Sequence, residues 1–150
     1  MKQHSTHSES DQTLAEQCAR VLYERDAASQ ALGIEIVEVR PGFTRASMQV
    51  RPDMVNGHDI CHGGMVFSLA DSAFAFCCNS FNAVTVAAGA TIDFLAPAHK
   101  GDRLIATATQ VWRSRRTGIC EITVTNQDGK VIALFRGRSH QLKEQILPDR

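Results

Sequence analysis

One carboxylate, Asp71, lies in the middle of a long apolar segment. It is the only charged residue between Asp59 and Asp93. No lysine or arginine occurs between Met54 and His99, so no cation close in sequence can pair with it. Burial of an unpaired carboxylate raises its pKa toward the range in which a general base works. We therefore expect Asp71 to act as a base or a nucleophile; the alternative is a structural role, opposite a distant arginine or facing solvent at an interface.

A polar loop, residues 56–64 with the sequence NGHDICHGG, leads directly into this segment. Gly63 and Gly64 stand where a helix is expected to begin, so their N–H groups lack intrahelical acceptors and are not shielded by a Cβ atom. Such groups can bind an oxyanion or a polarised carbonyl oxygen. Ordinary turn formation is the alternative for the two glycines, and capping or packing is the alternative for His62.

The spacing of these residues suggests a site that two chains share. Gly63 and Asp71 are eight residues apart, which is about 12 Å along a helix. Asp71 therefore cannot reach a carbon held at Gly63 of its own chain. Two antiparallel copies of the helix would bring Asp71 of one chain near Gly63 of the other, and we expect an obligate homodimer.

The C-terminal part of the chain is basic. Residues 100–143 contain nine basic and three acidic side chains. Arg113, Arg115 and Arg116 cluster at the expected end of a hairpin, a pattern that suits a small polyphosphate. A solvated face without a ligand is the alternative.

Neither a metal site nor a cysteine nucleophile is expected. Cys61 and His62 are adjacent, so their side chains point apart, and no third ligand follows at the spacing that a metal site needs. The five cysteines form no paired framework, which is typical of thiols in a reducing compartment.

The composition excludes several classes of protein. The chain has 150 residues, of which 43% are hydrophobic and 21% are charged, with 16 basic and 16 acidic side chains. These values are typical of one folded domain and exclude a disordered or coiled-coil chain. Zero net charge argues against a nucleic-acid partner. No stretch of 18 apolar residues could span a membrane, and the polar N-terminus (residues 1–11) has no apolar segment typical of a signal peptide. We therefore expect a cytoplasmic protein without a membrane partner.

Hydrophobic periodicity predicts the elements that hold these residues. A capping box at Thr13–Glu16 predicts a first helix that runs to about Ser29, and the pattern of residues 63–79 predicts a long helix that is buried on every side. Alternating runs predict strands over residues 34–39, 44–50, 84–97, 104–112, 119–125 and 131–138. The result is an α+β fold, an antiparallel sheet curled around one helix. We expect one domain, residues 13–142, between a flexible tail (1–12) and a C-terminal tail (143–150).

Several motifs together resemble the hotdog-fold acyl-CoA thioesterases of the phenylacetic-acid-degradation type. The similarity extends from about residue 20 to 141 and is carried by Asn56–His58, Cys61–Gly64, Phe67–Asp71, Thr91–Leu95 and Ala133–His140. The resemblance implies a hotdog dimer assembled into a homotetramer. The resemblance also implies that the enzyme needs no cofactor, because coenzyme A is part of the substrate.

The resemblance also implies roles for individual residues. Gly63 would hold the thioester carbonyl, beside Gly64. Asp71 of the facing subunit would act as base or nucleophile, Asn56 would orient the water or the carboxylate, and His62 would support the loop or contact the thioester. The coenzyme A phosphates would lie near basic residues, which we assign to Arg113, Arg115, Arg116, Arg136 and Arg138.

The expected reaction is hydrolysis of phenylacetyl-CoA or hydroxyphenylacetyl-CoA to the free acid and coenzyme A. The apolar side chains of Met65, Phe67, Phe74 and Phe81 are compatible with an aryl-acetyl group. One alternative is a hotdog enoyl-CoA hydratase or dehydratase, although that chemistry needs a histidine soon after the acid and none follows Asp71 before His99. The other is an acyl-CoA-binding module without catalysis.

Overall fold

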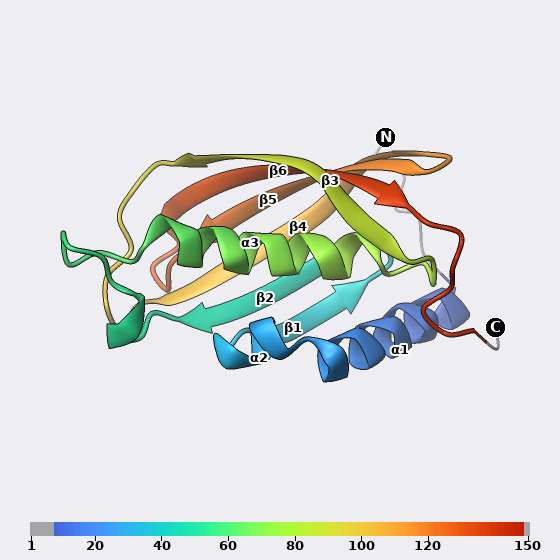
Figure 1. Ribbon diagram of the computed structural model, residues 1–150, viewed down its shortest axis with the longest axis horizontal. Helices are drawn as coiled ribbons and strands as arrows, with labels where there is room; N and C mark the ends of the chain where they lie inside the picture. Colours follow the sequence, from blue (N-terminus) through green and yellow to red (C-terminus); the bar gives the residue numbers. More distant parts are fainter. Residues whose placement is uncertain (1–7, 149–150) are drawn as a thin grey trace.

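The computed structural model describes residues 8–148 as a six-stranded antiparallel sheet that curls around one long helix (Figure 1). The strands follow the order β1-β2-β4-β5-β6-β3. The predicted α+β hotdog architecture is therefore confirmed. The elements are α1 (Glu9–Arg25), α2 (Ala27–Ala31), β1 (Glu35–Arg40), β2 (Phe43–Gln49), the 3-10 helix η1 (Pro52–Met54), α3 (Gly63–Cys78), β3 (Thr85–Phe94), β4 (Arg103–Ser114), β5 (Thr117–Thr125) and β6 (Val131–Gln141).

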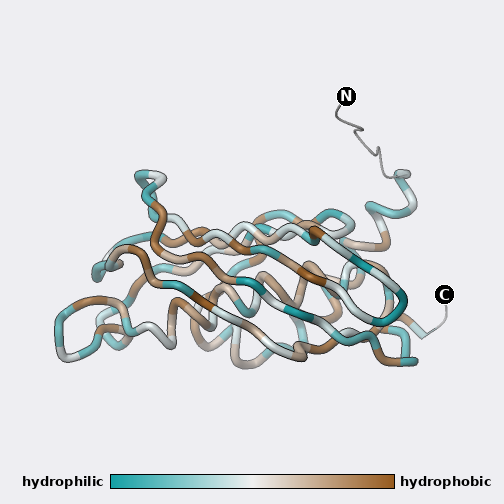
Figure 2. Tube along the Cα trace, turned by 90° about the horizontal axis from the view of Figure 1, so that it is seen from above, coloured by the Kyte–Doolittle hydropathy of each residue, from teal (hydrophilic) through white to brown (hydrophobic). Residues whose placement is uncertain are grey.

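The central helix α3 packs one face onto the concave side of the sheet. Leu69, Ala73 and Cys77 on this face have no solvent exposure. The Phe74 ring lies directly over Gly137 of β6, where an added Cβ atom would come within 2.7 Å of the ring. Because only a glycine permits this approach, Gly137 and Phe74 fix the rotation of α3 about its own axis. Buried and exposed residues alternate along much of β6, and hydrophilic residues gather in several of the turns at the ends of the sheet (Figure 2).

The prediction that α3 is buried on every side is wrong for the single chain. Gly64 and Ala75 are exposed, and Ser68 and Asp71 between them are half-buried. These four residues follow one another at helical spacing and form a stripe, here called the open stripe of α3. The sheet covers the opposite face of the helix and α2 covers one flank, so nothing in residues 8–148 covers the open stripe.

The first helix starts earlier than predicted and is interrupted. Ser8 is its N-cap, because the Ser8 side chain accepts a hydrogen bond from the Asp11 amide at 3.2 Å. Thr13 lies inside the helix and donates to the Glu9 carbonyl. The helix ends at Arg25, and Asp26, with non-helical backbone angles, separates it from α2. Residues 8–12 therefore belong to the folded domain, whereas residues 1–7 of the predicted tail lie outside the described residues.

The C-terminal segment also packs on the domain up to residue 148, rather than forming a separate tail. The Val84 amide donates to the Glu144 carbonyl at 2.9 Å, and the Leu142 amide donates to the Val84 carbonyl at 2.7 Å. The Asn82 side chain accepts from the Leu147 amide at 2.7 Å and donates to its carbonyl at 3.3 Å. This strap (residues 142–148) holds the loop that follows α3. Residues 149–150 lie outside the described part of the chain.

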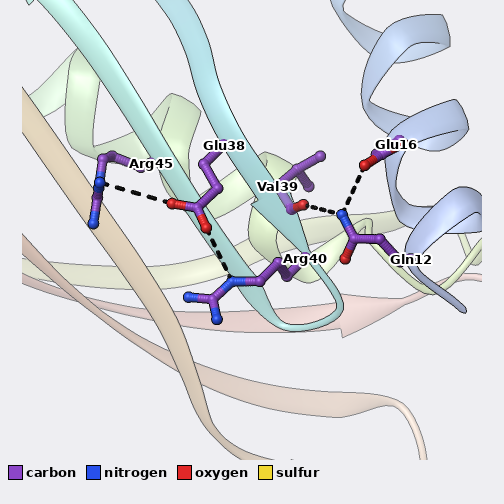
Figure 3. A network of polar contacts seen from close by, with 6 residues as sticks. All are labelled: Gln12, Glu16, Glu38, Val39, Arg40 and Arg45. Carbon is purple, nitrogen blue, oxygen red and sulfur yellow. Dashed lines mark hydrogen bonds and ion pairs between the residues drawn. The ribbon is translucent and has the colours of Figure 1, made fainter. Parts of the chain in front are cut away.

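The two edges of the sheet differ. At the β1 edge, the Glu38 carboxylate lies between Arg40 and Arg45, and the Gln12 side chain donates to the Val39 carbonyl (Figure 3). Charged side chains and a covering helix discourage the addition of another strand. The β3 edge is ten residues long and mostly exposed, and its only charged side chain is Asp93. A second chain is therefore better accommodated at β3. No helix within residues 8–148 combines the length and apolar character needed to cross a bilayer.

Candidate active site

The start of α3 leaves one backbone donor free. His62 is the N-cap residue, and its Nδ1 atom accepts the Gly64 N–H at 2.9 Å. Gly63, the first residue of the helix, has no intrahelical acceptor for its N–H and donates no other hydrogen bond within residues 8–148. The Gly63 amide is thus the donor that can bind a carbonyl oxygen. The His62 ring supports the loop, and the Gly64 amide is already occupied.

The Asn56 side chain organises the loop before α3. Its Oδ1 atom accepts from the His58 amide at 2.9 Å and from the Ile60 amide at 3.4 Å. Asp59, at the tip of this loop, has a φ angle of +60°. The Asn56 Nδ2 group donates no hydrogen bond within the described residues. Asn56 can therefore donate to a substrate or carboxylate oxygen, while its own oxygen is used by the loop.

A cavity of about 440 Å³ lies beside Gly63. Apart from Asn56, its lining side chains are apolar or carry only a thiol: Ile60, Cys61, Val66, Phe94, Leu95, Ala96, Pro97, Ala98 and Ile132. Burial raises the pKa of the Cys61 thiol to about 11, and the Asp102 carboxylate adds to this effect. Cys61 is therefore not a thiolate near neutral pH. The cavity suits an uncharged, apolar group.

Phe94 forms the wall of this cavity closest to Gly63. A Cβ atom added to Gly63 would lie 3.1 Å from Cζ of the Phe94 ring. The glycine thus allows an aromatic ring to lie against the start of the helix. Phe94 is 54% exposed, so the ring is accessible to a ligand in the cavity. Sequence reasoning did not single out Phe94 as a site residue, because its contact with Gly63 depends on the register of β3.

Asp71 lies on the open stripe of α3, half-buried. Desolvation raises the pKa of its carboxyl above the ordinary value of 3.8, and the nearby Asp26 carboxylate raises it further. Within residues 8–148, Asp71 forms no ion pair and accepts no side-chain hydrogen bond. The alternative of a distant arginine partner therefore does not apply in this chain. An unpaired carboxylate with a raised pKa is suited to accept a proton.

Three of the five arginines assigned to coenzyme A do gather in one place. Arg113, Arg115 and Arg116 line a shallow polar depression next to Cys78, the last residue of α3. The Arg113 guanidinium lies 4.0 Å over the Phe81 ring. This β4–β5 hairpin stands beyond the C-terminal end of α3, opposite the end that carries Gly63 (Figure 1). Within one chain, these arginines and Gly63 are not brought together.

Arg136 and Arg138 lie elsewhere, on the face of β6 that points away from α3. The Arg136 side chain forms an ion pair with Glu121 at 2.7 Å. Arg138 donates to the Ala88 carbonyl at 3.2 Å. Both alternate with buried residues that face the helix. The structure therefore separates these two arginines from the hairpin cluster and gives each of them a partner within the chain.

Comparisons with known proteins agree with this geometry. Residues 58–133 match the family model described as the thioesterase superfamily. The chain is 48% identical to acyl-coenzyme A thioesterase PaaI of Escherichia coli (strain K12), over 84% of this chain and 90% of that protein. A putative esterase of Deinococcus radiodurans is 36% identical over 78% of this chain and 80% of its own length.

Solved structures give the same result. The structure of the E. coli PaaI protein from the phenylacetic acid degradation operon has a TM-score of 0.88 and 46% identity, and the match covers 89% of this chain and 97% of that one. A mutant of the phenylacetic acid degradation protein PaaI from Thermus thermophilus has a TM-score of 0.73 and 36% identity, over 76% and 97% of the two chains. The chain therefore belongs to the thioesterase superfamily, in its PaaI-like branch, and is a thioester hydrolase.

Proposed function

We propose that the protein hydrolyses aryl-acetyl thioesters of coenzyme A, such as phenylacetyl-CoA or hydroxyphenylacetyl-CoA, to the free acid and coenzyme A. The main support is the free Gly63 amide at the mouth of an apolar cavity that has the Phe94 ring as a wall. A thioester carbonyl at the Gly63 N–H directs its acyl group into this cavity. The name of the E. coli relative supports the acyl-CoA class, and the operon of its structure supports the phenylacetyl group.

The proposed site needs two chains. Asp71 lies two helical turns from Gly63, about 12 Å along α3. We expect the exposed β3 edges of two copies to pair and their α3 helices to lie antiparallel. Such a dimer covers the open stripe of α3 and brings Asp71 of one chain toward Gly63 of its partner. It also brings the Arg113–Arg116 hairpin of the partner toward the same site, where the arginines would bind coenzyme A phosphates. Two such dimers would form the expected homotetramer.

The reaction then follows from these groups. The Gly63 N–H holds the carbonyl oxygen and stabilises the negative charge that develops on it. Asp71 of the partner takes a proton from a water molecule, whose oxygen attacks the carbonyl carbon. The Asn56 Nδ2 group orients this water or the carboxylate. The tetrahedral intermediate collapses with loss of the coenzyme A thiolate, which takes the proton from Asp71 and so restores the base. In the alternative route, the Asp71 carboxylate attacks the carbonyl carbon and expels the coenzyme A thiolate. Water then opens the anhydride to the free acid and the Asp71 carboxylate, and the proton released goes to the thiolate.

Release of free thiol from a panel of esters tests the proposal. The panel contains phenylacetyl-CoA, 3-hydroxyphenylacetyl-CoA, benzoyl-CoA, acetyl-CoA and hexanoyl-CoA. We expect the highest kcat/KM on the two phenylacetyl esters. Equal turnover across the panel would remove the aryl-acetyl preference, and turnover of none would contradict the proposal. In a single turnover in ¹⁸O-labelled water, label in Asp71 would support the anhydride route, and its absence would support direct attack by water.

Phe94 provides a sharper test of acyl preference. Phe94→Leu keeps an apolar wall but removes the aromatic ring that would stack on an aryl group. We expect kcat/KM for phenylacetyl-CoA to fall about two- to twelve-fold, as a stacking loss of about 0.5–1.5 kcal/mol predicts. The value for hexanoyl-CoA should change little. A parallel loss on both esters would show that Phe94 does not select the acyl group.

A further inference from the structure

The break between α1 and α2 places a second carboxylate, Asp26, beside the turn of α3 that carries Asp71 and Ser72. Asp26 caps α2, and its two oxygens accept from Ser29: Oδ1 from the backbone amide at 2.9 Å and Oδ2 from the hydroxyl at 2.6 Å. Ser29 is only 3% exposed, although it is polar. Asp26 itself is half-buried. This carboxylate is thus fixed in position by both of its oxygens.

A serine pair connects this cap to α3. The hydroxyls of Ser29 and Ser72 lie 2.8 Å apart. A carboxylate only accepts hydrogen bonds, so the Ser29 proton points to Asp26 and the Ser72 hydroxyl must donate to Ser29. The hydrogen bonds therefore run from Ser72 to Ser29 and from Ser29 to Asp26. Ser72 follows Asp71 directly on the same turn of α3, so this chain of hydrogen bonds, here called the Asp26 clamp, holds that turn.

Asp26 is the one charged group that acts on Asp71 in the described part of the chain. From α3 itself, the buried Cys78 thiol lies about two turns along the helix and donates to the Ala75 carbonyl at 3.5 Å. From α1, Tyr23 packs on Phe76 and donates its hydroxyl to the Ile34 carbonyl. The strands that pack against α3 give Asp71 no ion pair and no hydrogen bond within residues 8–148. Within one chain, desolvation and then the Asp26 charge are the influences that raise the pKa of Asp71.

We infer that Asp26, held against α3 by Ser29 and Ser72, is a positioning residue that keeps a second negative charge beside the turn that carries Asp71. A negative charge held beside a carboxylate disfavours its ionised form and so makes it a stronger base. The clamp keeps this charge at a fixed place and orders the turn that carries Asp71. The role in catalysis rests on the proposed function, in which Asp71 takes a proton from water. The electrostatic effect of Asp26 on Asp71 does not depend on the proposed function.

The test compares full-length variants by a titration that needs no substrate. The Asp71 carboxyl carbon is followed by ¹³C NMR as the pH changes, and its signal is assigned by its loss in Asp71→Asn. Asp26→Asn keeps an acceptor for the Ser29 amide, and thus the cap of α2, but removes the charge. In Asp26→Asn, we expect the midpoint of the Asp71 titration to move to lower pH. Asp26→Glu, which keeps the charge, should restore the midpoint most of the way. Asp128→Asn, in the β5–β6 turn, controls for net charge and should leave it unchanged.

A second variant guards against failure of Asp26→Asn to fold. Ser72→Ala cuts the clamp without touching the cap of α2, and its midpoint should move in the same direction. In each variant, the pH at which kcat on phenylacetyl-CoA falls at the acid side should follow the midpoint of the Asp71 titration. The plateau value of kcat should be lower by about two- to five-fold, because a weaker base accepts the proton.

An Asp71 midpoint that is the same in wild type, Asp26→Asn and Ser72→Ala would overturn the inference, and so would an equal movement in Asp128→Asn. If the midpoint of the Asp71 titration moves but the acid limb of the kcat–pH profile does not, the role of Asp26 in catalysis is overturned. Absence of turnover in the wild type would contradict the proposed function instead, and the NMR comparison would still decide whether Asp26 acts on Asp71.

Discussion

The ionised Asp71 carboxylate is needed for the proposed activity, but it lowers the stability of the fold. As the proposed base or nucleophile it is needed for turnover, and Asp71→Asn should lower kcat by about two to four orders of magnitude. Because burial raises its folded-state pKa above the unfolded value, ionisation of Asp71 destabilises the fold as the pH rises through the folded-state pKa. Below the unfolded value the carboxyl is neutral in both states and has no such effect.

The same substitution should therefore make the protein more stable near neutral pH. Asp71→Asn removes the buried charge and keeps a side chain of the same size, so we expect a higher Tm at pH 7.5. This gain should shrink as the pH falls through the folded-state pKa of Asp71. Calorimetry of wild type and variant across this pH range measures the difference. A gain that does not depend on pH, or a lower Tm at pH 7.5, would contradict an unpaired buried carboxylate.

Gly63 allows its backbone donor to be removed alone. Proline is favoured at the first position of a helix, and the extended backbone of His62 (φ −57°, ψ 132°) is compatible with a proline that follows. Gly63→Pro removes the N–H that would bind the carbonyl oxygen, and kcat should fall about 10²- to 10³-fold. Gly63→Ala is the matched control, because it also adds a Cβ atom 3.1 Å from Phe94 but keeps the N–H. Equal losses in the two variants would assign the effect to crowding.

At the residue scale, the sequence predicted the chemical character of single residues better than their hydrogen bonds and ion pairs. The isolation of Asp71 from cations is visible in the sequence, because no lysine or arginine lies near it along the chain. The use of the Asn56 oxygen by its own loop depends on the turn at Asp59, which has a positive φ angle. Arg136 was assigned to coenzyme A by family resemblance, but only the pairing of β5 with β6 brings Glu121 beside it.

At the scale of elements, the strap over residues 142–148 should stabilise the fold through Asn82. The Asn82 backbone has a φ angle of +60°, and its side chain forms both hydrogen bonds to Leu147. Asn82→Ala loses these bonds and places a Cβ-bearing, non-polar residue in the left-handed region, so we expect a loss of about 2–4 kcal/mol in the free energy of unfolding. Asn82→Gly adopts the same backbone freely.

Urea denaturation of the two variants separates these effects. Asn82→Gly should lose less stability than Asn82→Ala, since it loses the hydrogen bonds without the backbone strain. The contribution of the strap is contradicted if Asn82→Gly is as stable as the wild type. The sequence predicted residues 143–150 as a tail, because the strap has no hydrophobic period of its own. The strap is held in place by its hydrogen bonds to the loop that follows α3.

The strands and the central helix were predictable because their hydrophobic periods are regular. The break at Asp26 was not, since the apolar spacing of α1 and the residues of α2 both favour a continuous helix. Only the packing of α2 against α3 shows why the chain turns there, with Ser29 buried against Ser72. That break is the feature that brings Asp26 to Asp71, so the proposed positioning residue could not be found from spacing alone.

At the scale of the whole molecule, the pairing of β3 with β6 leaves β3 as an exposed edge, where we propose that a second chain binds. These strands are distant in sequence, and their pairing leaves one face of the site open along β3 and the open stripe of α3. The sequence could indicate a shared site, because the separation of Gly63 and Asp71 does not depend on topology. It could not indicate which strand forms the exposed edge, since that depends on long-range pairing.

Complementation tests the shared site directly. If Asp71 of one chain works with Gly63 of its partner, a dimer of one Asp71→Asn chain and one Gly63→Pro chain has one site with both substitutions and one with neither. Unfolding and refolding the two inactive variants together in equal amounts makes about half of the dimers mixed, each with one intact site of two. Activity should therefore return to about a quarter of the wild-type value.

Neither variant refolded alone should recover activity, and the recovered activity should depend on the mixing ratio, with a maximum at equal amounts. If Gly63 and Asp71 instead worked within one chain, every site in the mixture would lack one of the two groups. Mixing would then restore nothing, although mass spectrometry would still detect the mixed dimers. A mixture that remains inactive while mixed dimers form would thus rule out the shared site, whereas recovery near a quarter would require the two groups to come from different chains.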